Sequence, residues 1–273
     1  MTDPFAATAP AAPSSAAPVA PAAPVAVARP RVAWHVATVA STSRETSTAA
    51  RIVLDVPTWP GNAAGQHLDV RLTAPDGYSA TRSYSIASAG PGTQVVLAVD
   101  RLPDGEVSPF LVDELRAGDQ LEVHGPLGRF FVWQPGAADG RPVQLIAGGS
   151  GVVPLIAIAQ ARADASDATP FRLLYSVRTP EDVLFAPELD ALRATDAPLR
   201  VDLVYTRRTP DGWPVPAGRI DEARLLAAAI PVEDHPIVYV CGSTGFVERV
   251  ADWLVAAGHA GRDIRTERYG GTA

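Results

Sequence analysis

The stretch that decides the fold runs Leu145-Ile146-Ala147-Gly148-Gly149-Ser150-Gly151-Val152-Val153-Pro154. A short apolar run ends at paired glycines, and apolar residues then resume at a spacing that suits a helix. A strand, a glycine turn and a helix in this order begin a doubly wound α/β domain. Proline stands where the usual dinucleotide fingerprint has its last glycine. The alternatives are a turn whose backbone approaches dinucleotide phosphates and a tight strand–helix turn without a ligand.

Downstream of this stretch the sequence alternates between strand and helix patterns. Predicted strands cover Val143–Ala147, Phe171–Ser176, Val201–Tyr205, Ile237–Cys241 and Ile264–Glu267, and predicted helices cover Val153–Ala163, Glu181–Leu192, Asp221–Ala229 and Phe246–Ala257. Thr179 is expected to cap the second helix, and Gly258 to end the last one. Such alternation predicts a five-stranded parallel sheet covered by helices, the α/β domain, over 140–273.

Upstream of it the pattern is of short β-branched segments between turns. Predicted strands cover Val32–Val39, Arg51–Val56, His67–Leu72, Ser83–Ala87, Gln94–Val99 and Gln120–Val123, with a short helix over Val107–Leu115. This predicts a six-stranded antiparallel barrel domain over 31–135. Residues 1–30 are nearly all Ala, Pro, Val, Ser and Thr, a composition that predicts a disordered tail.

Composition excludes several classes of function. The net charge of −7 argues against a nucleic-acid-binding surface, which needs clustered basic charge. A single cysteine cannot form a disulfide within the chain or ligate an iron–sulfur cluster, which takes about four thiolates. No apolar stretch approaches the ~20 residues that span a bilayer, and no signal-peptide pattern begins the chain. The expected location is cytoplasmic, without membrane insertion.

Two further motifs stand in order around the glycine loop: Arg82-Ser83-Tyr84-Ser85-Ile86 before it, and Tyr239-Val240-Cys241-Gly242-Ser243-Thr244-Gly245-Phe246 after it. Together the three resemble the ferredoxin–NADP reductase family of flavoenzymes, and the resemblance covers roughly residues 31–269. It implies an enzyme that takes a hydride from a nicotinamide and passes electrons on singly.

The resemblance implies a flavin site on the barrel. Arg82 would pair with a flavin phosphate beside Ser83, Tyr84 would pack on the flavin, and Ser85 would hydrogen-bond the ring nitrogen that accepts hydride. The segment with Gly105, Val107 and Ser108 would hold a pyrophosphate at a helix N-terminus, which implies FAD rather than FMN. The alternatives are an ordinary strand with an exposed arginine and a capped surface helix.

The resemblance also implies a nicotinamide site on the α/β domain. Its cofactor-binding residues would be Gly149, Ser150, Gly151, Val152, Pro154, Ser176, Arg178, Arg207, Arg208, Cys241 and Gly242. Arginines after the second and third strands favour the 2′-phosphate of NADPH, with NADH possible, although a solvated loop fits them too. Cys241 would position the nicotinamide by packing, or be a small core residue.

Near the end of the sequence, Glu267 and Tyr269 match the family's Glu-x-Tyr, whose ring covers the flavin. Four residues follow Tyr269 here, so an edge-strand tyrosine is the alternative. The predicted catalytic residues are thus Ser85, Cys241, Glu267 and Tyr269. The five histidines show no metal spacing, so no metal site is predicted and each is expected to be structural or exposed.

The predicted function is that of an NAD(P)H-dependent, FAD-containing reductase, acting as a monomer with a separate acceptor such as a ferredoxin, flavodoxin, haem or metal protein. The alternatives are a flavodoxin, ferric or free-flavin reductase on the same fold, and a flavin-binding sensor or assembly subunit without turnover.

Overall fold

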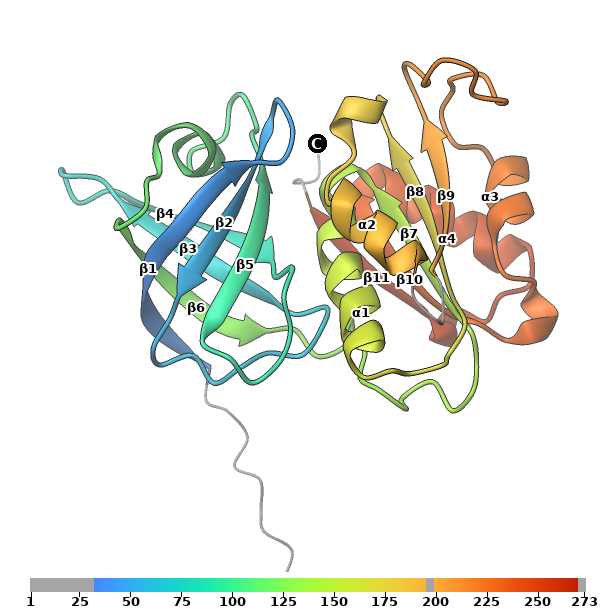
Figure 1. Cartoon of the computed structure of the whole chain (residues 1–273), viewed down its shortest axis with the longest axis horizontal. Coiled ribbons are helices and arrows are strands. Elements are labelled where there is room, and N and C mark those ends of the chain that lie inside the picture. The colour runs from blue at the N-terminus through green and yellow to red at the C-terminus, as the bar shows by residue number, and fades with distance from the viewer. Residues whose placement is uncertain (1–31, 195–198, 270–273) are drawn as a thin grey trace, which may run out of the picture. The chain divides into compact units, whose positions relative to one another are not determined.

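The computed structural model describes residues 32–194 and 199–269. The segment 1–30, for which the sequence predicts disorder, lies outside the described residues. The described chain forms one antiparallel and one parallel sheet, which confirms the predicted fold class (Figure 1). The predicted domain boundaries at 31–135 and 140–273 stay a prediction.

The antiparallel sheet has the strand order β4-β3-β6-β1-β2-β5. A bridge between Ile86 and Leu97 brings its two ends together, so the sheet closes into a barrel. Along each strand alternate side chains enter the barrel core; Ile52 and Leu54 are buried there. The strands are β1 (Ala33–Arg44), β2 (Ala49–Asp55), β3 (His67–Thr73), β4 (Ser79–Ser85), β5 (Gln94–Asp100) and β6 (Gln120–Leu127).

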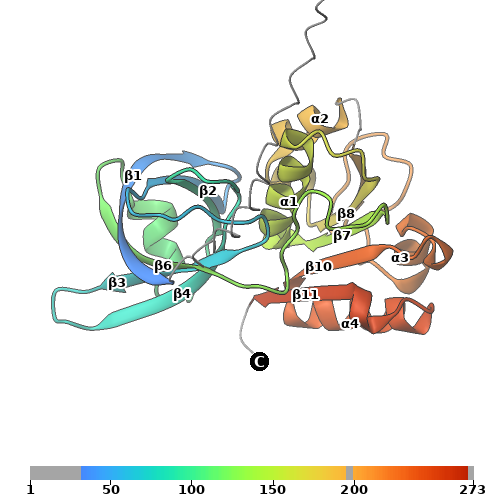
Figure 2. The ribbon, with the colours of Figure 1, turned by 90° about the horizontal axis from the view of Figure 1, so that it is seen from below.

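The parallel sheet has the order β11-β10-β7-β8-β9, so the winding reverses between β7 and β10. Leu145 packs into the cluster under α1 and α2, and its neighbour Ile146 packs into the cluster under α3 and α4. Figure 2 shows the two helix pairs on opposite faces. The elements are β7 (Val143–Gly148), α1 (Val152–Asp164), β8 (Phe171–Val177), α2 (Ala186–Arg193), β9 (Arg200–Tyr205), α3 (Glu222–Ala228), β10 (Ile237–Ser243), α4 (Thr244–Ala256) and β11 (Ile264–Tyr269).

One helix begins later in the structure than the sequence predicted. The sequence predicted a helix from Glu181, but only the short 3-10 turn η3 (Pro180–Asp182) forms there, and α2 begins at Ala186. The Thr179 hydroxyl donates to the Asp182 carboxylate at 2.8 Å rather than capping a helix. The chain then leaves the helical path, because the backbone N–H of Leu184 donates to the buried Tyr175 hydroxyl at 3.3 Å. Tertiary contacts here override a good local start signal.

The other differences are small. The helix predicted over Val107–Leu115 is shorter, and five of its residues form the π-helical segment η1 (Phe110–Glu114). The remaining short helical turns are η2 (Gly149–Gly151), η4 (Val232–Asp234) and η5 (Gly261–Asp263). Gly258, with φ 97°, follows α4 and ends it as predicted. Within the described residues, no helix is long and apolar enough to cross a membrane.

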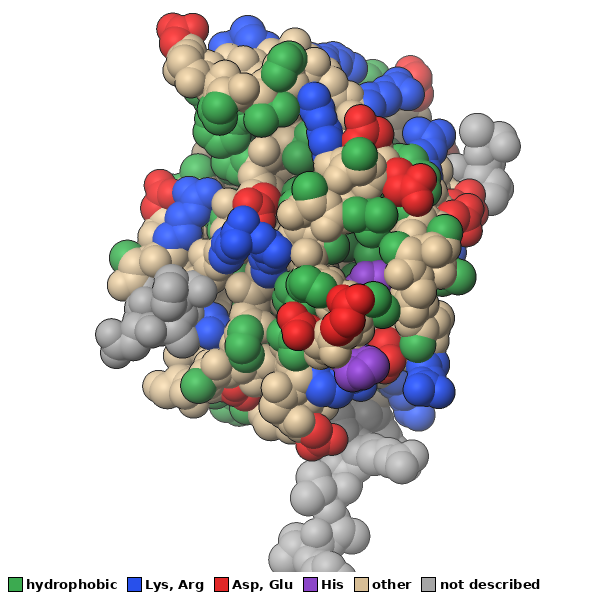
Figure 3. Space-filling view, turned by 90° about the vertical axis from the view of Figure 1, so that its right-hand side faces the viewer, with side chains coloured by type: hydrophobic (Ala, Val, Ile, Leu, Met, Phe, Trp, Pro, Cys, Tyr) green, Lys and Arg blue, Asp and Glu red, His purple; other side chains and the backbone are tan. Residues whose placement is uncertain are grey.

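Figure 3 shows the face that carries α3, on the right of Figure 1. Arginine and acidic side chains are interspersed over it, and no large area of one sign appears.

Candidate functional site

A cavity of about 290 Å³, here the barrel cavity, opens at the ends of β4 and β5. Apolar side chains such as Val99 and Val153 form part of its wall, and hydroxyl and guanidinium groups form the rest. Burial raises the pKa of Tyr84 to about 12, so its phenol stays protonated. The structure brings together all seven residues predicted for the flavin, namely Arg82, Ser83, Tyr84, Ser85, Gly105, Val107 and Ser108.

Arg82 is already paired in this cavity. Its guanidinium donates to the Glu106 carboxylate and, at 2.8 Å, to the Thr81 carbonyl. The Tyr78 hydroxyl also donates to Glu106, at 2.7 Å. Tyr78 and Arg82 together hold the pKa of Glu106 below its usual value, so the carboxylate is ionised at neutral pH. A phosphate that entered this cavity would have to compete with Glu106 for Arg82.

Ser108 has a structural task as well as a place in the wall. It is buried, and its hydroxyl oxygen accepts the backbone N–H of Leu102 at 3.0 Å. A Cβ on Gly105 would stand 2.8 Å from that oxygen, so glycine is needed for the turn to close. The hydroxyl hydrogen of Ser108 is left available for a second partner.

A second cavity, also of about 290 Å³, lies at the carboxyl ends of the parallel strands and is called here the strand-end cavity. It forms where the winding of the sheet reverses, the usual place for a ligand in such folds. Thr46, Thr48 and Asp100 of the barrel complete its wall. Of the predicted nicotinamide-site residues, those in its wall are Gly149, Ser150, Ser176 and Arg178.

The two cavities share a wall made by Asp100, Ser150 and Tyr269. The Tyr269 hydroxyl donates to the Gly148 carbonyl at 2.6 Å, which fixes the ring between the two openings. Gly149 has a φ of 55°, and a Cβ placed on this glycine would stand only 3.2 Å from the Tyr269 hydroxyl oxygen. Sequence reasoning missed Asp100, because an acid at the end of a strand is also typical of a turn.

The remaining residues predicted near the nicotinamide line neither cavity, and among them Cys241 is buried whereas Arg207 and Arg208 are exposed. Cys241 is 2% exposed, and burial raises the pKa of its thiol. A Cβ on Gly151 would stand 2.2 Å from the Cys241 carbonyl oxygen, so this glycine is required for packing of the loop on β10. Those outside both cavity walls are Gly151, Val152, Pro154, Arg207, Arg208, Cys241, Gly242 and Glu267.

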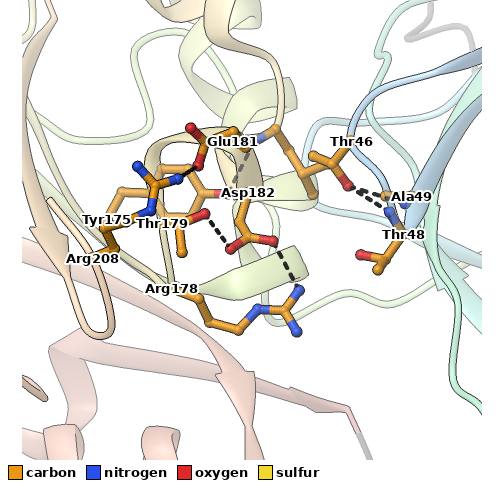
Figure 4. Close-up of polar contacts among 10 residues, drawn as sticks. Thr46, Thr48, Ala49, Tyr175, Arg178, Thr179, Glu181, Asp182 and Arg208 are labelled. Carbon is orange, nitrogen blue, oxygen red and sulfur yellow. Dashed lines mark hydrogen bonds and ion pairs between the residues drawn. The ribbon is translucent and has the colours of Figure 1, made fainter. Parts of the chain in front are cut away.

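The arginines after β8 and β9 meet two acids that sequence reasoning did not weigh against them (Figure 4). Arg178 donates to Asp182 at 3.1 Å, and Asp182 lines the strand-end cavity. Arg208 pairs with Glu181 and thereby lowers the pKa of that carboxyl to about 2. The Arg208–Glu181 pair is exposed on both sides, so solvent screens it strongly, whereas Asp182 in the other pair is largely buried.

A groove of about 380 Å³, here the arginine groove, continues from the strand-end cavity over α4. The two share Ser176, Thr206, Ser243 and Phe246 in their walls. Arg219 and Arg249 also line the groove, and neither lies within ion-pair distance of a carboxylate among the described residues. No pattern of spacing linked these two arginines in the sequence.

Two family models match successive parts of the chain, and the second match includes the glycine loop. One describes an oxidoreductase FAD-binding domain and matches residues 36–132; the other describes an oxidoreductase NAD-binding domain and matches residues 145–252. The chain belongs to the ferredoxin–NADP reductase family. Its cofactors are therefore FAD and a nicotinamide dinucleotide, as predicted.

Named relatives carry the same pair of domains. The chain is 31% identical over 212 residues to the glycine betaine monooxygenase reductase subunit of Chromohalobacter salexigens, covering 76% of this chain and 56% of the relative. It is 29% identical to one component of the 1,2-phenylacetyl-CoA epoxidase of Escherichia coli, covering 86% and 68%. The chain thus spans about half to two thirds of the length of these relatives.

A solved structure agrees with the fold. The flavohaem-like FAD/NAD-binding domain of nitric oxide dioxygenase from Vibrio cholerae O1 biovar El Tor superposes with a TM-score of 0.75 at 26% identity. The match covers 87% of this chain and 99% of that one.

The residues present fit FAD. The barrel cavity is lined by apolar surface that includes Tyr84 and Val153, by hydroxyl groups, and by a guanidinium that suits a phosphate. A further cavity of about 550 Å³ lies next to it, and Glu106 lines both. Among the described residues, no cluster of His, Cys, Asp or Glu could hold a metal ion.

Proposed function

We propose that the chain is a reductase that oxidises a reduced nicotinamide dinucleotide and delivers the electrons to a separate redox protein. The observation that carries this proposal is the wall common to the barrel and strand-end cavities, because a flavin and a nicotinamide in those cavities would meet at Tyr269. Bound FAD supplies the chemistry, since it accepts a hydride and releases electrons singly.

The chain's own residues bind and align the two cofactors. Arg82 and Ser108 would hold the FAD pyrophosphate, and Tyr84 and Ser85 would hold the ring. Ser150 and Ser176 would hold the dinucleotide at the strand ends. Cys241 and Glu267 would then lie beside the nicotinamide once Tyr269 moves aside. Holding the two cofactors close together in this way would be the main contribution of the protein to the reaction rate.

We propose NADPH as the preferred coenzyme, with its 2′-phosphate in the arginine groove. Arg219 and Arg249 carry unneutralised charge there, whereas Arg178 and Arg208 are paired with acids. NADH is the second candidate, because the Asp182 carboxylate in the adjoining wall suits ribose hydroxyls and repels a phosphate.

Variants of the arginines in the arginine groove and of the arginines after β9 should differ in their effect on NADPH use. Arg219→Ala should lower kcat/KM for NADPH about ten- to a hundred-fold, the worth of one charge-assisted hydrogen bond, and leave NADH nearly unchanged. The double variant Arg207→Ala with Arg208→Ala is the matched control and should change little. If only the double variant loses NADPH, the phosphate lies on the β9 loop, as the sequence suggested. A wild-type preference for NADH would overturn the proposal.

The acceptor is proposed to be a separate redox protein. Two of the relatives are named as parts of a monooxygenase and of an epoxidase. The single cysteine of these 273 residues cannot ligate an iron–sulfur cluster in the usual way, so a ferredoxin-type or oxygenase partner would carry the next centre.

Anaerobic stopped-flow mixing of the FAD-loaded chain with NADPH tests the function. Rapid bleaching of the flavin absorbance, followed by reoxidation with ferricyanide, is expected. A flavin that stays oxidised would instead support the sensor or assembly role.

A further inference from the structure

The ring of His67 lies at a contact between the two sheets. His67 begins β3, and its Nδ1 atom lies 3.1 Å from Oε1 of Glu267 on β11. By geometry Nδ1 makes no hydrogen bond among the described residues, so its contact with Glu267 is an ion pair rather than a well-directed hydrogen bond. The ring packs over Gly128, where a Cβ would stand 3.3 Å from Nδ1.

His67 stands in register with one predicted catalytic residue, Ser85, and its ring contacts another, Glu267. It lies directly opposite Ser85 in the antiparallel pair of β3 and β4, so both side chains leave the same face of the sheet. Ser85 lines the barrel cavity. Glu267 is paired with Cys241 across β10 and β11. His67 therefore joins the barrel side of the site to the strand-end side.

The charge of His67 depends on Glu267. The Glu267 carboxylate beside the ring raises the pKa of His67, burial opposes this effect, and Asp69 adds to it. These two acids are the charged groups that face the ring, one from β11 and one from β3; His124 on β6 lies 3.6 Å from Asp69. Because the pKa is raised, the ion pair is present at lower pH and is lost as the pH rises through that pKa.

One carboxylate oxygen of Glu267 lacks a hydrogen-bond donor among the described residues. Its Oε2 atom is buried and has no hydrogen-bond partner among the described residues. A buried acceptor without a donor is costly, so a donor arriving there gains a strong hydrogen bond. Glu267 lies two residues before Tyr269 on the same face of β11, next to the wall between the cavities.

On the basis of the reductase function proposed above, we propose that His67 is a positioning residue. Its imidazolium holds Glu267 so that Oε2 accepts a hydrogen bond from the primary amide of the nicotinamide. His67 thereby makes coenzyme affinity depend on pH.

Calorimetric titration of the FAD-loaded chain with NADP⁺ between about pH 6 and 9 tests this, since a histidine titrates in that range. Wild-type affinity should fall as the pH rises. His67→Gln should weaken binding about tenfold at the low end and flatten the profile, because it removes one charge-assisted contact. Glu267→Gln is the second variant and should flatten it too. His124→Gln, on the neighbouring strand, should keep the wild-type affinity and profile.

Proton NMR of the His67 ring supplies a readout that is independent of binding. Its pKa should fall in Glu267→Gln and stay unchanged in His124→Gln. The inference is overturned if His67→Gln keeps the wild-type affinity and pH profile, or if the pKa of His67 is the same in Glu267→Gln as in the wild type. A wild-type chain that reduces no flavin defeats the proposed function instead, and this inference falls with it.

Discussion

Removing Tyr269 should tighten coenzyme binding, because in the function proposed here the nicotinamide reaches the barrel cavity only when this ring leaves the common wall. The Tyr269 hydroxyl bond to the Gly148 carbonyl must break in that movement. One such bond is worth about 0.5–1.5 kcal/mol. The ring is 38% exposed, so more than half of its surface is also uncovered when it leaves. At about 25 cal/mol per Å² over roughly 80 Å² of apolar surface, that adds ~2 kcal/mol.

Two variants separate these contributions. Tyr269→Phe removes only the hydrogen bond, so the Kd for NADP⁺ should fall about 2- to 12-fold. Tyr269→Ser removes both terms and should lower the Kd by a factor of about 50 or more. The assay is titration of the FAD-loaded chain, with the flavin difference spectrum recorded alongside. An unchanged Kd and an unchanged spectrum in both variants would refute the covering role and leave an edge-strand tyrosine.

The remaining predictions concern flavin binding, packing and the tail. Arg82→Ala should weaken FAD binding by about 1.5–3 kcal/mol, whereas Glu106→Gln should strengthen it several-fold by freeing Arg82. Equilibrium dialysis would measure both affinities. Equal losses of FAD affinity in the two variants would contradict competition between Glu106 and the phosphate for Arg82. Gly151→Ala should destabilise the fold by roughly 2–4 kcal/mol in thermal unfolding, because its Cβ meets the backbone of β10, while Gly245→Ala, with open space around it, should be neutral or stabilising. Deleting residues 1–30 should leave the melting temperature and the turnover with ferricyanide unchanged, and a large loss of either would contradict the predicted dispensability.

Much of the fold follows from local pattern. The apolar run Leu145–Ala147 forms a strand and the glycines after it form a turn, as predicted from the shortness of the run and the backbone freedom of glycine. The six barrel strands were predicted for the same reason, and only their ends moved. The start of α2 was missed, because the hydroxyl of Tyr175 and a carboxylate of the barrel, Glu45, hold the backbone at Leu184 and Phe185.

The candidate site divides in the same way. The sequence predicted Arg82, Ser85 and Ser150 through the family resemblance of their motifs, and the structure places all three in cavity walls, while their roles stay predictions. The tertiary structure alone decided which charges meet. Glu106 faces Arg82 across 24 positions of the chain, and Glu267 faces His67 across the two sheets. Coulomb and hydrogen-bond energies depend on distances of a few ångströms, and such distances between remote residues exist only once the chain has folded.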